Sequence, residues 1–187
     1  MGHAQYDTDG FDQAAASRPR ERVAVKGCIF KDGRLLFLFK PDAARRLSIA
    51  PDLEEDLPGG CVETGESWQE ALVREVREET GLTPHAWRYR GIVTFVSGRW
   101  VTEYMHLFTI TGWTGAVRSC NEGILEWVPK DELLDLPHWK GDEVFLKLIA
   151  DPEQPFFSLK LVYDANDELV EARLDGEPLD LIDWNWA

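Results

Sequence analysis

Residues 60–82, GCVETGESWQEALVREVREETGL, constrain the fold of this chain more than any other stretch. Six glutamates stand around two arginines, between glycines near each end. Ser67 is placed to cap a helix, because Glu70 follows three residues later as in a capping box. Gly81 is placed to end that helix. The stretch therefore predicts a glycine-bracketed loop that leads into one helix.

Three carboxylates crowd one face of that predicted helix, because Glu78 and Glu79 follow Glu75 at helical spacing. Like charges at this spacing oppose a helix by a few tenths of a kcal/mol per pair. They are useful around a hard cation, and oxygen ligands without histidine or cysteine favour Mg²⁺ or Mn²⁺ over zinc. The alternative is a solvated surface helix in which Arg74 pairs with Glu70 or Glu78. That alternative explains neither the glycines nor the crowded carboxylates.

The stretch resembles the signature of the Nudix hydrolases, G-x5-E-x7-R-E-U-x-E-E-x-G-U, where U is a bulky aliphatic residue. Nine residues fill every fixed position at the required spacing: Gly60, Glu66, Arg74, Glu75, Val76, Glu78, Glu79, Gly81 and Leu82. The resemblance implies an α/β fold of the Nudix type, an α/β/α sandwich around a mixed β-sheet. It also implies divalent ions at Glu75, Glu78, Glu79 and Gly60, and catalysis by Glu78 and Glu79 with Arg74 as a clamp beside them.

The composition supports a metal-bridged, anionic substrate. The chain has 187 residues, 44% of them hydrophobic and 29% charged, as in a soluble domain with a core of ordinary size. Its net charge of −14 argues against binding along a nucleic-acid polymer. A small phosphorylated ligand remains compatible, because bound divalent cations invert the local field. The expected partner is therefore a small nucleotide.

Neither targeting nor membrane signals are evident in the sequence. No apolar run approaches the roughly 20 residues of a membrane span. The first residues are polar and acidic, unlike a signal peptide. The three cysteines are widely spaced and lack a metal or disulfide pattern. Reduced thiols in a cytoplasmic protein, a monomer or a homodimer, are the simplest interpretation.

The chain divides into a flexible arm (1–20), the Nudix domain (21–176) and a tail of unknown docking (177–187). Within the domain, RVAVKGCIF and LLFLFK predict a hairpin that turns at Asp32-Gly33. Other strands are expected at 87–97 and 101–113, and a hairpin starts at Phe157. A second helix is expected at 142–150. The first helix should turn Trp68, Leu72 and Val76 toward the core.

Gly59 and Gly60 allow the backbone to approach a ligand closely and to turn its amides toward a phosphate. Many relatives carry a lysine directly after this pair, where this chain has Cys61. Asp56 falls where related enzymes place a residue that helps to hold the base. A loop-capping aspartate is the structural alternative.

In MutT-type enzymes a glutamate before a Glu-Trp strand joins the metal cluster or polarises the attacking water. Glu122 matches that glutamate, and a turn residue is the alternative. In some relatives a glutamate from the strand region around Glu103 also reaches the metals. His106, between Met105 and Leu107, is expected to be packed or at an edge.

Trp139 and Asp142 match the tryptophan and the second acidic position with which some purine-nucleotide hydrolases hold the base; Gly141 replaces the first. An indole can stack on a purine and a carboxyl group can read its edge. Core packing is the alternative for the tryptophan.

The C-terminal part resembles a bacterial subgroup of 8-oxo-dGTP diphosphatases. The predicted substrate is thus a purine nucleoside triphosphate such as 8-oxo-dGTP, hydrolysed to the monophosphate and pyrophosphate. A pyrophosphatase for nucleotide sugars, ADP-ribose or dinucleoside polyphosphates, and a non-catalytic nucleotide-binding module, stay as alternatives.

Overall fold

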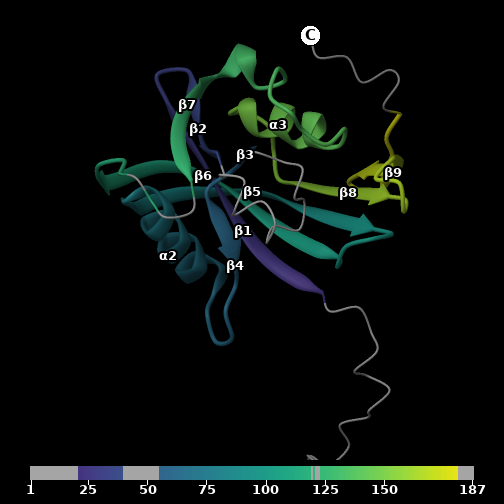
Figure 1. The fold of residues 1–187 in the computed structure, drawn as a ribbon, viewed down its shortest axis with the longest axis horizontal. Coiled ribbons are helices and arrows are strands. Elements are labelled where there is room, and N and C mark those ends of the chain that lie inside the picture. Colours follow the sequence, from purple (N-terminus) through teal and green to yellow (C-terminus); the bar gives the residue numbers. More distant parts are fainter. Residues whose placement is uncertain (1–20, 40–54, 119, 121–122, 181–187) are drawn as a thin grey trace, which may run out of the picture.

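A computed structural model describes residues 21–39, 55–118, 120 and 123–180 (Figure 1). The elements follow in the order β1 (Arg22–Lys31), β2 (Arg34–Phe39), β3 (Glu55–Asp56), β4 (Gly59–Cys61), α2 (Trp68–Thr80), β5 (Leu82–Ser97), β6 (Glu103–Gly115), β7 (Ile124–Pro129), a 3₁₀ turn (Lys130–Glu132), α3 (Asp142–Ala150), β8 (Phe157–Tyr163), β9 (Leu169–Leu174) and β10 (Glu177–Pro178). Neither α2 nor α3 is long and apolar enough to span a membrane.

The strands form a mixed sheet in the order β10-β9-β8-β5-β6-β1-β2-β3. β1 runs parallel to β6, and β5 runs parallel to β8. The short strand β4 pairs with β1, and β7 pairs with β2. Because β4 joins β1 directly, the glycine pair at 59–60 lies beside the centre of the sheet rather than at its edge. The mixed sheet predicted from the sequence is confirmed.

The sheet passes between the two helices, with α2 on one face and α3 on the other (Figure 1). On the α2 face, one buried cluster joins Ala71, Leu72 and Val76 of the helix to Val25 and other apolar strand residues. On the α3 face, a second cluster joins residues of α3 to strand residues that include Cys28. Side chains alternate along a strand, so β1 supplies both cores and separates them. The α/β/α sandwich is therefore confirmed.

Local signals in the sequence agree with most of these elements. The β1–β2 hairpin turns at Asp32-Gly33, with Lys31 opposite Arg34. Ser67 and Glu70 form the predicted capping box of α2. Gly81 ends the helix with a φ of 77°, a left-handed conformation that glycine adopts without a steric penalty. The predicted helix at 142–150 is α3.

The prediction that Trp68 faces the core is wrong. Leu72 and Val76 are buried, but Trp68 is 42% exposed. Its ring stacks on His106, with 3.9 Å between the ring centroids. Trp68 is the first residue of α2. Its ring therefore lies over His106 of β6 at the end of the helix, and not in the buried interface between the helix and the sheet. His106 is packed, as predicted, and the Tyr89 hydroxyl lies 2.7 Å from its Nδ1.

Arg90 fixes α3 to the sheet. It is fully buried on β5, at a register shift between β5 and β6. Its guanidinium donates to the backbone carbonyls of Leu148, Ile149 and Asp151 at the C-terminal end of α3, at 2.6–3.1 Å. A cation at this end also complements the helix dipole. The C-terminal end of α3 is thereby held against the sheet.

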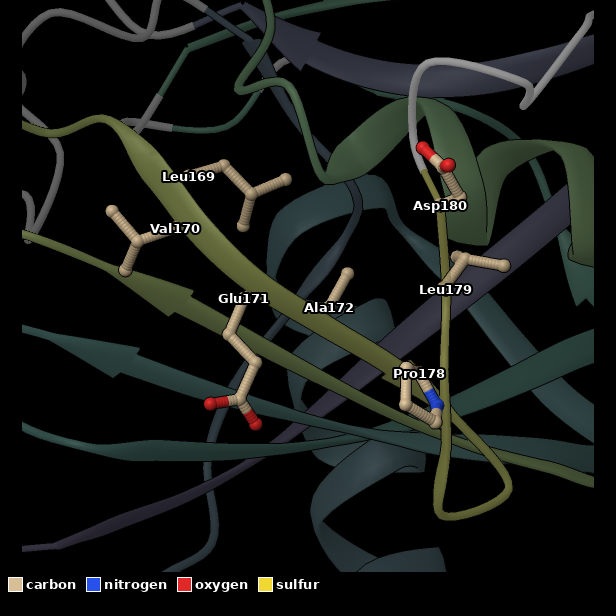
Figure 2. Close-up of a pocket in the computed structure, with 7 residues that line it drawn as sticks. All are labelled: Leu169, Val170, Glu171, Ala172, Pro178, Leu179 and Asp180. Atoms are coloured by element: carbon tan, nitrogen blue, oxygen red, sulfur yellow. The ribbon is translucent and has the colours of Figure 1, made fainter.

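A groove of about 430 Å³ lies at the far edge of the sheet, between β9 and the residues around β10 (Figure 2). Leu169, Val170, Ala172 and Leu179 give it apolar walls. β8, β5 and β6 separate β9 from β1, so this groove is remote from the 60–82 stretch. β10 pairs with β9, which places residues 177–178 of the expected tail in the sheet. Trp184 and Trp186 lie outside the described residues.

Candidate active site

The glycine pair at 59–60 makes close contacts with strand β1 and with helix α2. Gly59 has a φ of +152°, and a Cβ there would lie 2.0 Å from the carbonyl oxygen of Val25. The Gly59 amide donates to Glu79 Oε2 at 2.7 Å. A Cβ at Gly60 would lie 2.5 Å from the carboxyl carbon of Glu75. Glycine is thus required at 59 by the backbone of β1 and at 60 by the carboxylate of Glu75.

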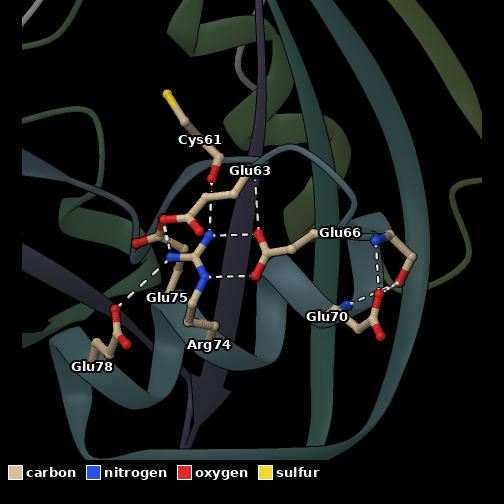
Figure 3. A network of polar contacts seen from close by, with 8 residues as sticks. Cys61, Glu63, Glu66, Glu70, Arg74, Glu75 and Glu78 are labelled. Carbon is tan, nitrogen blue, oxygen red and sulfur yellow. Dashed lines mark hydrogen bonds and ion pairs between the residues drawn. The ribbon is translucent and has the colours of Figure 1, made fainter.

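Arg74 organises the carboxylates around it (Figure 3). Its Nε and Nη2 donate to both oxygens of Glu66 at 2.7 Å, and its Nη1 donates to Glu75 at 2.8 Å. Nη2 also reaches the carbonyl oxygen of Cys61 at 3.0 Å. The arginine therefore links the loop that carries Glu66, strand β4 and helix α2. Such bidentate, charge-assisted pairing fixes geometry as well as charge.

The predicted partners of Arg74 need one correction. Glu78 lies 3.8 Å from Nη1, as expected for an i,i+4 pair. Glu70 does not pair with Arg74, because its carboxylate accepts from the backbone and hydroxyl of Ser67 instead. The hydrogen bonds from Arg74 lower the pKa of Glu66 to about 2. The hydrogen bond with Glu66, reinforced by Glu75, raises the pKa of Arg74.

We call Gly59, Gly60, Glu66, Arg74, Glu75, Glu78 and Glu79 the box cluster. Of its four predicted metal ligands, the three glutamates differ in exposure: the side chains of Glu78 and Glu75 are 57% and 17% exposed, whereas Glu79 is buried. Among the described residues, no three acidic, histidine or cysteine side chains converge closely enough to hold an ion. The donor set is nonetheless all oxygen, and the absence of a side chain at Gly60 lets the Glu75 carboxylate approach the backbone. Both features fit a hard divalent cation.

A second cluster, Lys26, Asp56, Trp139 and Asp142, lies on the α3 face of the sheet; we call it the Lys26 cluster. Lys26 Nζ lies 2.6 Å from both carboxylate oxygens of Asp56. Burial alone would lower the pKa of Lys26, but the charges of Asp56, Glu103 and Glu79 outweigh burial and raise it. The ammonium is therefore held as a buried cation among acidic groups.

Trp139 and Asp142 are joined at the start of α3. The Trp139 backbone amide donates to Asp142 Oδ2 at 3.2 Å. The Trp139 ring packs edge-on against Tyr163 and Phe95. Asp142 as a residue is partly exposed, but protein surrounds its carboxyl group, and this burial raises its pKa to about 7. The charge of Asp56 raises this pKa further, whereas those of His138 and Lys26 lower it.

The structure thus brings Asp56 and Asp142 within electrostatic range of each other, although 86 residues separate them in the sequence.

The other predicted site residues lie elsewhere. Glu122 lies outside the described residues. Glu103 is 8% exposed and lies 3.8 Å from Arg22. The Sγ atom of Cys61 accepts a hydrogen bond of 2.8 Å from Arg22 Nη2.

Lys26 was not among the residues predicted from the sequence. A signal for it existed: it is the one charged residue within the apolar run VAVKGCIF, at an inward-facing position two residues before the buried Cys28. A charged side chain at the centre of a strand that is buried on both faces needs a buried partner. That partner, Asp56, could not be identified from the sequence pattern alone.

Comparisons with known proteins agree with this architecture. The model of the NUDIX domain family matches residues 20–149. The chain is similar to a crystal structure of a MutT protein from Bacillus halodurans, with 30% identity and a TM-score of 0.70, covering 84% of this chain and 99% of that one.

Curated relatives have various names. An uncharacterised Nudix hydrolase, YvcI of Bacillus subtilis, is 31% identical, covering 82% of this chain and 94% of that one. A CTP pyrophosphohydrolase of Escherichia coli is 29% identical, over 67% of this chain and 92% of that one. An oxidized purine nucleoside triphosphate hydrolase of Danio rerio is 27% identical, over 63% and 74%. With the family match, the box cluster and the fold in agreement, the chain belongs to the Nudix family and is a Nudix hydrolase of the MutT type.

Proposed function

We propose that this protein is a divalent-metal-dependent pyrophosphohydrolase that converts purine nucleoside triphosphates, including oxidised forms such as 8-oxo-dGTP, to the monophosphate and pyrophosphate. The observation that carries the proposal is the approach of Glu75 and Glu79 to the Gly59-Gly60 backbone. A phosphate chain beside these glycines faces carboxylates, which repel it unless cations intervene. The net charge of −14 makes the same demand for the whole protein.

Glu75, Glu78, Glu79 and the backbone at Gly60 are the proposed ligands of Mg²⁺, with Mn²⁺ as a substitute. A bound divalent cation neutralises phosphate charge and lowers the pKa of an attacking water. Arg74 keeps Glu75 and Glu66 in place, so that the ligand set needs little reorganisation. Glu79, buried and held by the Gly59 amide, is the proposed acceptor of the proton from the attacking water. Glu122 is proposed to assist from its loop.

The Lys26 cluster supports a base-binding role for Asp56, Trp139 and Asp142. A carboxyl group with a pKa of about 7 is substantially protonated at neutral pH and can then donate a hydrogen bond to a base. Asp56 is held by Lys26 and accepts. Donor and acceptor together can read the edge of a base, while an indole offers a stacking surface.

Two alternatives have specific support. The name of the Escherichia coli relative favours a pyrimidine triphosphate such as CTP. The box cluster by itself is equally compatible with ADP-ribose, nucleotide sugars or dinucleoside polyphosphates, because it contacts only the shared diphosphate. A non-catalytic module is disfavoured, because all three carboxylates of the predicted ligand set are present.

A substrate panel with Mg²⁺ tests the proposal. Steady-state kcat/KM is measured for 8-oxo-dGTP, dGTP, dATP, CTP and ADP-ribose, and products are separated to distinguish pyrophosphate from orthophosphate. We expect the guanine nucleotides to give the highest values, with the monophosphate and pyrophosphate as products. Equal or better turnover of ADP-ribose or CTP would contradict the proposal.

A further inference from the structure

Lys26 is the strongest feature of the α3 face that the proposed reaction does not use. It lies within β1 and is 9% exposed. Its neighbours in sequence, Val25 and Gly27, face α2, whereas Lys26 faces α3 together with Cys28. Burial of an ammonium group is costly unless it is paired and hydrogen-bonded. The chain therefore contains acidic groups arranged around this one cation.

The pairing with Asp56 is close. Both carboxylate oxygens lie 2.6 Å from Lys26 Nζ, so both are directed toward the ammonium. Asp56 itself lies on a two-residue strand, opposite Leu38 of β2. So short a strand does little to orient a side chain. The ion pair with Lys26 therefore contributes to the direction of the carboxylate.

Lys26 also lies between the two clusters. In the β1–β4 ladder it is directly opposite Gly59, the residue whose amide binds Glu79. Its charge acts on Asp142 of α3 as well as on Glu79 of α2. Lys26 thus lies between the groups proposed to bind the base and the glycines proposed to face the phosphates.

We propose that Lys26 is a specificity-determining residue that acts through Asp56: it fixes the Asp56 carboxylate in one orientation, as an acceptor for the adjacent N–H groups of a guanine-type base. This inference rests on the proposed base-binding role of Asp56. Each carboxylate oxygen can accept more than one hydrogen bond, so pairing with Lys26 leaves acceptor capacity.

The chemistry of the two purines gives the direction of the selectivity. Guanine presents two neighbouring N–H donors on its Watson–Crick edge, which match two carboxylate oxygens. Adenine presents a ring nitrogen acceptor there, which faces a carboxylate unfavourably. A site built to bind N–H groups rejects an analogue that lacks them more strongly than an apolar pocket rejects a change of size.

The competing explanation is that Lys26 only compensates buried negative charge. The experiment compares Lys26→Met, Asp56→Asn and the double variant Lys26→Met/Asp56→Asn. Removal of Lys26 alone leaves Asp56 beside Glu103 and Glu79 without its cation, so this variant is expected to be unstable. The double variant removes one charge of each sign and should recover stability, as measured by thermal unfolding. The decisive readout is the ratio of kcat/KM for dGTP to that for dATP, with kcat and KM determined separately.

If Lys26 acts through Asp56, Lys26→Met lowers the dGTP/dATP ratio about tenfold or more, mainly through KM for dGTP. The double variant then lowers the ratio no further than Asp56→Asn alone, because Lys26 has no further effect without Asp56. Should Lys26→Met fail to fold, Lys26→Arg, which keeps the charge but changes the geometry of the pair, carries the ratio test. A matched control is Lys160→Met/Glu171→Gln, which removes an exposed ion pair on β8 and β9 and should leave the ratio unchanged.

A folded Lys26→Met or Lys26→Arg variant with the dGTP/dATP ratio of the wild type would overturn the inference, since Lys26 would then only balance charge. This outcome differs from failure of the proposed function. If the wild-type protein has no preference for guanine nucleotides, the base assignment fails before any variant is made. If the wild type prefers dGTP and the variants keep that preference, only the role of Lys26 fails.

Discussion

The box cluster takes its helix, loop and glycine contributions from 23 consecutive residues and their immediate neighbour Gly59, whereas the Lys26 cluster takes its side chains from β1, β3 and the start of α3. In the first, spacing along one helix and one loop sets the geometry. In the second, the pairing of β1, β2 and β3 and the packing of α3 set it. The proposed chemistry on the diphosphate is therefore encoded locally, while the proposed selection of the base depends on the whole fold.

The two clusters also hold their charges differently. Glu66 and Glu78 of the box cluster retain solvent contact and share one arginine. Lys26 and the Asp142 carboxyl group are enclosed by protein. Exposed carboxylates remain available to exchangeable cations. The protonation of enclosed groups, and with it their affinity for a ligand, changes with small changes of the surrounding structure. Substitutions in the two clusters should consequently fail in different ways: the first in kcat, the second in KM and stability.

The largest effect is expected from Glu79→Gln. An amide oxygen can still accept from the Gly59 amide, so the fold is retained, but the anionic charge next to the diphosphate is lost. We expect kcat to fall by about three orders of magnitude or more, with KM little changed. Steady-state kinetics on the best nucleotide of the panel measures this.

Glu70→Gln is the matched control for that variant, because Glu70 lies on the same helix but serves only the capping box. Glutamine can still complete the capping box, so the stability should change little and turnover should be unchanged. Equal activity of Glu79→Gln and the wild type would remove Glu79 from the proposed mechanism.

A smaller effect is expected from Arg74→Lys. Lysine keeps the positive charge but cannot donate to Glu66, Glu75 and the Cys61 carbonyl oxygen at once. We expect kcat to fall by about 10–100-fold, with weaker binding of Mg²⁺ seen as a higher metal concentration for half-maximal rate. Arg77→Lys, an exposed change one helical turn from the end of α2, provides the comparison and should behave as wild type. Normal metal dependence in Arg74→Lys would show that the clamp is dispensable.

The smallest effect is expected from Asp142→Asn, seen as the pH dependence of stability. The pKa of Asp142 is raised from 3.8 to about 7, mainly by burial, so the folded state binds the proton more tightly than the unfolded state. The stability that this group contributes is present below about pH 4 and is lost as the pH rises toward 7, on the order of 1–4 kcal/mol in total. Asparagine removes this dependence. Thermal unfolding should therefore show Asp142→Asn more stable than wild type at pH 8 and similar at pH 4; identical profiles would contradict the assignment.

The contrast between the clusters also explains what could be predicted from the sequence. The capping box at Ser67 and Glu70 and the left-handed Gly81 depend on neighbours within a few residues, so their geometry was predictable. The Asp32-Gly33 hairpin is local in the same sense. Arg74 was predicted to pair within the helix, but its principal partner, Glu66, lies in the preceding loop, where spacing rules for helices do not apply.

The tertiary arrangement explains the features that were not predicted correctly from the sequence. Lys26 lies within the otherwise apolar run VAVKGCIF of β1, and its ion pair with Asp56 exists only because β1, β2 and β3 come together in the sheet. Trp68 follows the helical apolar period and yet is half-exposed, because the helix period does not reveal where the supporting sheet ends. Asp56 and Asp142 were named individually, and their mutual influence depends on the packing of α3 onto the sheet.

The most direct test of this separation is to measure base preference in the absence of chemistry. Binding of dGMP and dAMP, which contain no anhydride to hydrolyse, can be measured by titration calorimetry for the wild type, Glu79→Gln and Lys26→Met/Asp56→Asn. The account predicts that Glu79→Gln, despite its lost turnover, keeps the wild-type ratio of dGMP to dAMP affinity, and that the double variant loses it. A collapsed ratio in Glu79→Gln, or a preserved ratio in the double variant, would contradict the division between the box cluster and the Lys26 cluster.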